Sequence, residues 1–161
     1  MSRIFVTVGA QMPFDRLVHA VDRWARSEGI GNDVLAQIGN SAHPPHHIRW
    51  VRFLSPSEFD RAYDQAELIV AHAGTGSLLC AIERGTPIVV MPRQAKLRET
   101  RNDHQLATCK AFAAFPNVFI AWNEEELPSV LARAMHVPKR PHPLKASSTL
   151  LAAIRHFIDS D

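Results

Sequence analysis

The sequence predicts an α/β fold, a Rossmann-like doubly wound parallel sheet of about six strands. Two observations support this prediction. Short apolar runs typical of buried strands alternate with segments whose apolar residues recur at helical spacing. Small-residue turns containing Gly9 and Gly74 follow two of these runs, before the next helical segment begins. Strands that alternate with helices in this way form βαβ units, whose strands pair in parallel.

Length and composition indicate a single globular domain. The chain has 161 residues, of which 46% are hydrophobic, and a chain of this length buries about 70% of its unfolded surface. The net charge is only +2, from 18 basic and 16 acidic residues, so no strong field for nucleic acid is expected. The predicted domain spans residues 1–161, with a proline-rich linker near 137–143 and a C-terminal helix near 144–158. That helix either crosses to a second domain or packs on its own sheet.

Neither the cysteines nor the apolar runs indicate export or a membrane span. Cys80 and Cys109 form no C-x-x-C motif and no zinc spacing, so we expect them to be reduced in a cytoplasmic protein. The N-terminal apolar run is too short for a signal peptide. No run of about 20 apolar residues is present. We therefore expect any membrane association to come from another molecule.

The first third of the chain is predicted to form three strands and one helix, with a histidine-rich loop and the start of a second helix. The predicted elements are a strand at 4–8, a helix at 13–27, and strands at 34–38 and 48–53. Ser55 and Glu58 have the spacing of a capping box, which predicts the start of the next helix. Residues 40–47 contain three histidines but no carboxylate or cysteine nearby, and we expect no metal site there.

The stretch from Glu67 to Pro87 contains the most informative motif. A buried strand ends at His72, and the turn Gly74–Ser77 leads into a helix that stops at Gly85. Such a junction directs unpaired N–H groups and the positive helix end at one point, where a phosphate can bind. A plain strand-to-helix turn fits the same residues. The turn after the first strand, Gly9 to Gln11, is placed to border the same pocket, although Gln11 also fits a solvated turn.

A basic segment follows the next strand, which is predicted at 88–91. It contains four basic residues but only two acids, Glu99 and Asp103; the basic residues are Arg93, Lys96, Arg98 and Arg101. A charge run of this kind is usually a solvated loop, but here it follows the carboxyl end of a strand, where open α/β sheets bind ligands. A helix is predicted from Asn102 or Asp103, with His104 and Gln105 in its first turn. A last strand at 118–121 and a helix from Asn123 complete the pattern.

Three motifs in order give the chain a family resemblance. H-A-G-T-G-S, G-T-P-I-V-V-M-P and N-D-H-Q resemble the nucleotide-sugar half of glycosyltransferase family 28, which has the GT-B fold and includes MurG. The opening V-T-V-G-A-Q-M-P-F-D-R-L resembles the start of its stand-alone halves. These are the PssE-type exopolysaccharide transferase subunits and the eukaryotic dolichol-linked GlcNAc-transferase catalytic subunit. The resemblance runs from about residue 3 to about residue 110.

This resemblance implies the C-terminal half of a GT-B enzyme. The chain would be the donor-binding subunit of a two-component, inverting transferase in bacterial exopolysaccharide synthesis, using UDP-glucuronate or UDP-GlcNAc without a metal or cofactor. A membrane-anchored acceptor-domain subunit would supply the general base and the polyprenyl-diphosphate-linked acceptor. It would recruit the chain to the inner face of the plasma membrane. The alternative is a non-catalytic nucleotide-sugar-binding module that regulates or stabilises a partner transferase.

The resemblance also assigns a nucleotide-sugar site, although it identifies no catalytic residue. The expected site residues are Gly9, Gln11, His72, Gly74, Thr75, Gly76, Ser77, Glu83, Arg93, His104 and Gln105. Family members usually carry an acid for the ribose where this chain has Cys80, so Glu83, one turn later, is the substitute or simply a surface residue. Arg93 would contact a glucuronate carboxylate or the diphosphate.

Overall fold

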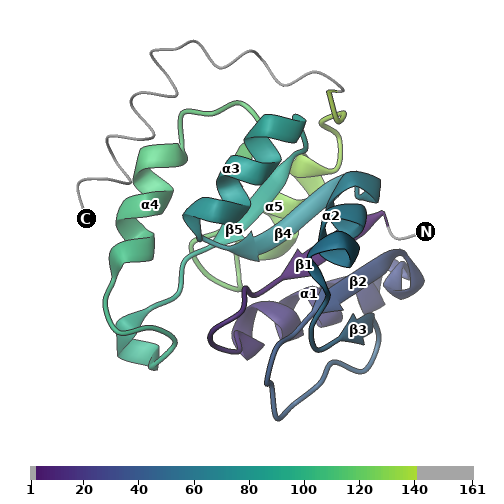
Figure 1. Ribbon diagram of the computed structural model, residues 1–161, viewed down its shortest axis with the longest axis horizontal. Helices are drawn as coiled ribbons and strands as arrows, with labels where there is room; N and C mark the ends of the chain where they lie inside the picture. The colour runs from purple at the N-terminus through teal and green to yellow at the C-terminus, as the bar shows by residue number, and fades with distance from the viewer. Residues whose placement is uncertain (1–2, 141–161) are drawn as a thin grey trace.

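The computed structural model describes residues 3–140 and contains one six-stranded parallel sheet (Figure 1). The strands are β1 Ile4–Thr7, β2 Val34–Gln37, β3 Arg49–Val51, β4 Leu68–His72, β5 Ile88–Met91 and β6 Val118–Ile120. Their order across the sheet is β3-β2-β1-β4-β5-β6, and every neighbouring pair is parallel. The predicted doubly wound parallel sheet is confirmed.

Helices cover both faces of this sheet. They are α1 Asp15–Glu28, α2 Pro56–Gln65, α3 Thr75–Arg84, α4 His104–Phe112 and α5 Leu127–Ala134, with short 3-10 turns η1 Gly31–Asp33 and η2 Ala95–Leu97. The apolar residues of α1 and α5 share one core cluster, and those of α2, α3 and α4 share the other. None of the helices within residues 3–140 is long and apolar enough to cross a membrane.

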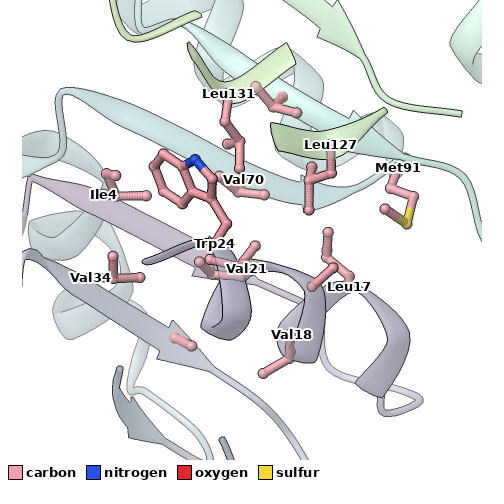
Figure 2. Packing of buried hydrophobic residues seen from close by; sticks show 14 of the residues in the cluster. Ile4, Leu17, Val18, Val21, Trp24, Val34, Val70, Met91, Leu127 and Leu131 are labelled. Atoms are coloured by element: carbon pink, nitrogen blue, oxygen red, sulfur yellow. The ribbon is translucent and has the colours of Figure 1, made fainter. Parts of the chain in front are cut away.

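The core between α1, α5 and the sheet is mostly aliphatic, with Phe14 and Trp24 as its buried aromatic residues. Figure 2 shows Trp24 of α1 reaching toward Leu131 of α5 beside the sheet residue Val70. Leu131 and Val70 are fully buried, and burying a side chain of this size contributes about 1.5–3 kcal/mol. This packing holds α1 and α5 together against the sheet.

The opposite face is held by aromatic contacts that extend to the start of α3. Phe5 of β1 packs edge-on against Phe59 of α2, with ring centroids 5.5 Å apart. The hydroxyl of buried Tyr63 donates to the carbonyl oxygen of Ser77 at 2.6 Å. Burial raises the pKa of Tyr63 well above its usual range, so this donor stays protonated. The bond fixes α2 to the first turn of α3.

The strand order reverses between β1 and β4, and this places two turns side by side. Thr7 of β1 is in register with Ala71 of β4. Helix α1 leaves β1 toward one face of the sheet and α3 leaves β4 toward the other. A crevice forms outside the carboxyl ends of strands at such a switch point, and ligands of open α/β sheets bind there.

Local capping signals predicted the start of α2 and the end of α3. The Ser55–Glu58 capping box is present, and α3 ends at Gly85 in the left-handed conformation, with φ 63°. The third strand is shorter than predicted, spanning only Arg49–Val51. Helix α5 begins at Leu127 rather than Asn123, because the Asn123 side chain accepts the N–H of Glu126 at 2.9 Å and closes a turn first. The predicted helix at 144–158 lies outside the described residues, as does most of the predicted linker.

The histidine-rich loop is fastened to α1 by a buried carboxylate. Asp22 accepts the backbone N–H of His47 at 2.7 Å and of Ile48 at 3.0 Å, and its other oxygen lies 2.9 Å from Nδ1 of His47. Burial alone would raise the pKa of Asp22, but these hydrogen bonds outweigh it and lower the pKa. The loop is therefore organised by a helix residue that precedes it in the sequence by about twenty-five positions.

Candidate functional site

A cavity of about 140 Å³ opens beside the switch point, at the carboxyl ends of the strands. Three parts of the chain line it: the β1–α1 loop from Val8 to Met12, His72 at the end of β4, and the segment from β5 into α4. Of the predicted site residues, the structure brings together here Gly9, Gln11, His72, Arg93 and Gln105. These residues come from three strand ends, which is the arrangement that the motif order indicated.

The His72 ring lies between the two predicted glycine turns. A Cβ atom on Gly9 would lie 2.9 Å from Cε1 of His72, and a Cβ on Gly74 would overlap Nε2. The absence of a side chain at these two glycines therefore leaves room for the His72 imidazole. Gly76 differs, because a Cβ there would meet nothing within 4 Å. Of the two turn glycines after β4, only Gly76 faces open space.

His72 is neutral at physiological pH. Burial and the nearby positive charge of Arg93 lower the pKa of His72 to about 4. The polar backbone of Thr7 acts in the opposite direction and raises this pKa, but by less. No group among the described residues has hydrogen-bonding geometry to its buried Nδ1. A neutral imidazole offers one donor and one acceptor, and the ring nitrogen without a partner here is the buried Nδ1.

Arg93 is a clamp between β5 and the β1–α1 loop. Its Nη2 donates to the carbonyl oxygens of Val8 and Met12 at 2.7 Å each, and its Nη1 donates to that of Pro13 at 2.9 Å. A fourth, longer bond of 3.3 Å reaches the carbonyl of Glu99. A guanidinium has five N–H donors, so protein carbonyls already occupy four. The expectation that Arg93 pairs with a sugar carboxylate or the diphosphate therefore needs correction: its guanidinium holds the loop.

An ion-pair network lies behind the cavity and was not predicted from the sequence. Arg16 of α1 pairs with Glu99 at 2.9 Å and with Glu124 at 3.1 Å, and it also donates to the Pro92 carbonyl at 3.1 Å. The Arg16 and Glu99 side chains are only 13% and 12% exposed. No local sequence signal identifies this network, because the partners of Arg16 lie 83 and 108 positions further along the chain.

The start of α3 presents three backbone donors. The first hydrogen bond of this helix runs from the Leu78 N–H to the Gly74 carbonyl at 3.2 Å, and no side chain caps the helix. The N–H groups of Thr75, Gly76 and Ser77 make no hydrogen bond to any described residue. These groups and the helix dipole favour an anion. His72 separates this helix end from the cavity, because its ring contacts both Gly9 and Gly74.

Two predicted site residues lie elsewhere. Glu83 is exposed in the last turn of α3, about 12 Å along the helix from Thr75 at 1.5 Å per residue, so it cannot take the place of the missing ribose acid. His104 is exposed in the first turn of α4 and does not line the cavity. Its neighbour Gln105 does, and Gln105 Oε1 accepts the Arg93 backbone N–H at 2.9 Å. Cys80 packs against the core under α2, α3 and α4.

This arrangement is suited to binding an anion and holds no evident general base. Donors come from the α3 N-terminus, from the Gln105 amide and from His72, all near one end of the sheet. Glu99 is the one carboxylate that lines the cavity, and Arg16 already holds it. Within residues 3–140, no group of three or more histidine, cysteine or acidic side chains is placed to hold a metal ion.

Comparisons with known sequences give a consistent family match. A sequence model of the glycosyltransferase family 28 C-terminal domain matches residues 3–158. The UDP-N-acetylglucosamine transferase subunit ALG13 of Mus musculus is 33% identical over 119 residues, which cover 68% of this chain and 10% of that protein. The protein of the same name from Eremothecium gossypii is 27% identical over 176 aligned positions, covering 87% of this chain and 85% of that protein. The chain thus spans about a tenth of the mouse protein's length.

Solved structures match the fold over nearly the whole chain. Acinetobacter baumannii MurG superposes with a TM-score of 0.62 at 18% identity, covering 99% of this chain and 49% of that one. The solution structure of ALG13 gives a TM-score of 0.60 at 18% identity, covering 95% and 94%. At these identities the likeness is one of fold, and in MurG it spans about half of the longer chain.

Proposed function

This chain belongs to the glycosyltransferase family 28 C-terminal domain family, and from that premise we propose that it is the donor-binding subunit of a UDP-sugar-dependent glycosyltransferase. The observation that carries the proposal is the uncapped start of α3, where the N–H groups of Thr75, Gly76 and Ser77 lie beside His72 and make no hydrogen bond within residues 3–140. Such a helix end stabilises the negative charge of a diphosphate. It also stabilises the charge that develops on UDP as it leaves the sugar.

We propose UDP-GlcNAc as the donor, ahead of UDP-glucuronate. The relatives of mouse and Eremothecium gossypii are both named as UDP-N-acetylglucosamine transferase subunits. A glucuronate carboxylate would need a cation, and Arg93, the cation in the cavity lining, already donates four hydrogen bonds to backbone carbonyls. An N-acetyl sugar carries no charge and makes no such demand.

We propose that a second subunit completes the enzyme. An inverting displacement requires a base to take the proton of the acceptor hydroxyl, and the carboxylate that lines the cavity here is paired with Arg16. The fold corresponds to about half of MurG, and the curated relatives are named as subunits. The partner would be a membrane-anchored acceptor domain that presents a polyprenyl-diphosphate-linked sugar at the inner face of the plasma membrane. Bacterial exopolysaccharide synthesis is the process that we propose.

The test is sugar transfer from a panel of radiolabelled UDP-sugars to membrane lipid extract. It uses this chain alone, an acceptor-domain chain alone, and both together. We expect transfer from UDP-GlcNAc only when both chains are present. Robust transfer by this chain alone would contradict the two-subunit proposal, and preference for UDP-glucuronate would contradict the donor.

A non-catalytic role remains as a second candidate because of Cys80 and Glu83. Cys80 packs against the core, and Glu83 lies in the last turn of α3. Neither is placed to accept hydrogen bonds from the ribose hydroxyls. Calorimetry separates the two candidates. UDP-GlcNAc binding without transfer by any reconstituted pair would favour a regulatory nucleotide-sugar-binding module.

A further inference from the structure

The outer side of the segment between β5 and α4 carries a cationic turn around an exposed leucine. Lys96, Arg98 and Arg101 are exposed, and none of the three forms an ion pair within residues 3–140. Leu97 lies between the first two and is 49% exposed. Figure 1 shows this turn standing out from the body of the molecule below α4. We call residues 95–101 the basic turn.

The basic turn is held in a fixed shape. The Arg98 N–H donates to the Ala95 carbonyl at 2.9 Å, and the Ala95 N–H donates to the Asp103 carboxylate at 2.9 Å. Arg98 adopts a left-handed conformation with φ 58°, and it is the only non-glycine residue with a positive φ in the described part of the chain. Arg16 anchors the base of the turn through Glu99. Leu97 is therefore presented to solvent by a braced turn rather than by a loose loop.

The two acids near the turn are already engaged. Glu99 is largely buried against Arg16, and Asp103 accepts a backbone N–H. The outward surface therefore combines three cations that form no ion pair within residues 3–140, the exposed carboxylate of Asp103, and one aliphatic side chain. That combination matches the edge of a lipid bilayer, where cations meet headgroup phosphates and an apolar side chain enters the interface below them.

We propose that the basic turn is a contact site for anionic lipid headgroups. An aliphatic centre favours lipid over nucleic acid, because single-stranded nucleic acid is bound by cations interleaved with aromatic side chains, and residues 95–101 contain none. Three cations near an anionic surface raise membrane partition roughly a hundredfold. One contact of this strength is weak and reversible, so it would orient a chain that a second attachment holds at the membrane. The proposal does not rest on the proposed function.

The experiment is sedimentation of the purified chain with vesicles. Phosphatidylcholine vesicles are compared with vesicles of equimolar phosphatidylcholine and phosphatidylglycerol, at about 0.1 M and about 1 M salt. We expect partition onto the anionic vesicles alone, lost at high salt. The triple variant Lys96→Gln, Arg98→Asn, Arg101→Gln should bind roughly ten- to a hundredfold more weakly. Asparagine is used at position 98 because it tolerates the left-handed conformation.

Two controls match these changes elsewhere on the surface. Arg26→Gln, Lys110→Gln and Arg133→Gln together remove the same charge from exposed positions on three helices and should leave partition within about twofold. Leu97→Ser should weaken partition about tenfold, since it removes the apolar contact. Met135→Ser, at a residue 41% exposed, should not. Equal partition of the two triple variants, binding to neutral vesicles, or no binding at all would each overturn the proposal.

Discussion

The imidazole of His72 fills the space that a side chain on Gly9 would need, with Cε1 only 2.9 Å from where a Cβ would lie. This contact joins the ends of β1 and β4, the two strands between which the sheet order reverses. Gly9 also has φ 78°, a conformation that other residues rarely adopt. The ring is thus largely surrounded by protein where the two turns meet, and burial lowers its pKa.

We predict that His72 makes the protein less stable at acid pH. Its pKa is about 4 in the folded chain against 6.5 unfolded, so the unfolded state binds the proton first as pH falls. The stability that the neutral ring contributes is complete above pH 6.5 and is lost as pH falls toward 4, by about 2–3 kcal/mol. Urea unfolding of the wild type and of His72→Gln across this range measures the difference.

The same comparison with the exposed histidine His43 is the control for this prediction. His43→Gln should leave the pH dependence of unfolding close to that of the wild type. A His72→Gln variant whose stability falls with acid as steeply as the wild type would show that His72 does not carry the effect.

We predict that Arg93→Lys destabilises the fold and loosens the loop beside the cavity. A lysine has three donors on a single nitrogen and cannot span the carbonyls of Val8, Met12 and Pro13. Losing charge-assisted bonds to buried carbonyls should cost about 2–4 kcal/mol. Thermal unfolding measures the loss, and UDP titration should show weaker binding. Arg101→Lys, at an exposed position, should change neither, and an unchanged melting temperature in Arg93→Lys would refute the clamp.

We predict that Gly76→Val blocks UDP binding without unfolding the chain. A Cβ at Gly76 meets no protein atom, so a valine would fill only the space before the free N–H groups of α3. We expect UDP affinity to fall at least tenfold by calorimetry, with stability changed by less than about 1 kcal/mol. Ser57→Val is the matched control, because Ser57 holds the same second position in α2. If wild type and Gly76→Val bound UDP with equal affinity, the phosphates would not bind at the start of α3.

The features of the fold and the site that depend on neighbouring residues could be predicted from the sequence, and those that depend on distant residues could not. The capping box at Ser55 and the glycine stop at Gly85 act within one helical turn, and both were predicted. His72 was predicted at this edge of the sheet because it ends β4, and Gln105 because it lies in the first turn of the helix after β5; both line the cavity. Glu83 was misplaced since one further turn of a helix moves a side chain about 5 Å.

The clamp and the ion-pair network could not be found this way. Arg93 donates to carbonyls 80 and more residues earlier in the chain, and Arg16 meets Glu99 across 83 positions. In the sequence, Arg93 and Glu99 look like members of a solvated charge run. Their burial follows from the sheet topology, which brings the β1–α1 and β5–α4 loops together, and no local pattern encodes it.

The last prediction separates the charge of the cavity from its shape, using Gln105→Glu. In the wild type, Gln105 Oε1 accepts the Arg93 backbone N–H at 2.9 Å, and a carboxylate oxygen can accept the same bond. Stability should therefore change by less than about 1 kcal/mol. The added negative charge would lie at the same end of the sheet as the proposed diphosphate, across the His72 ring from it, so we expect UDP affinity to fall roughly tenfold at low salt and less at high salt.

Uridine provides the decisive comparison for this variant, because it has the base and ribose of UDP without the phosphates. Its affinity should be the same for wild type and Gln105→Glu. Gln94→Glu adds the same charge to the same segment, at a half-buried residue outside the cavity lining, and it should leave UDP affinity within about twofold. If Gln105→Glu weakened uridine and UDP equally, the cavity would hold the nucleoside, and the diphosphate would have to be placed elsewhere.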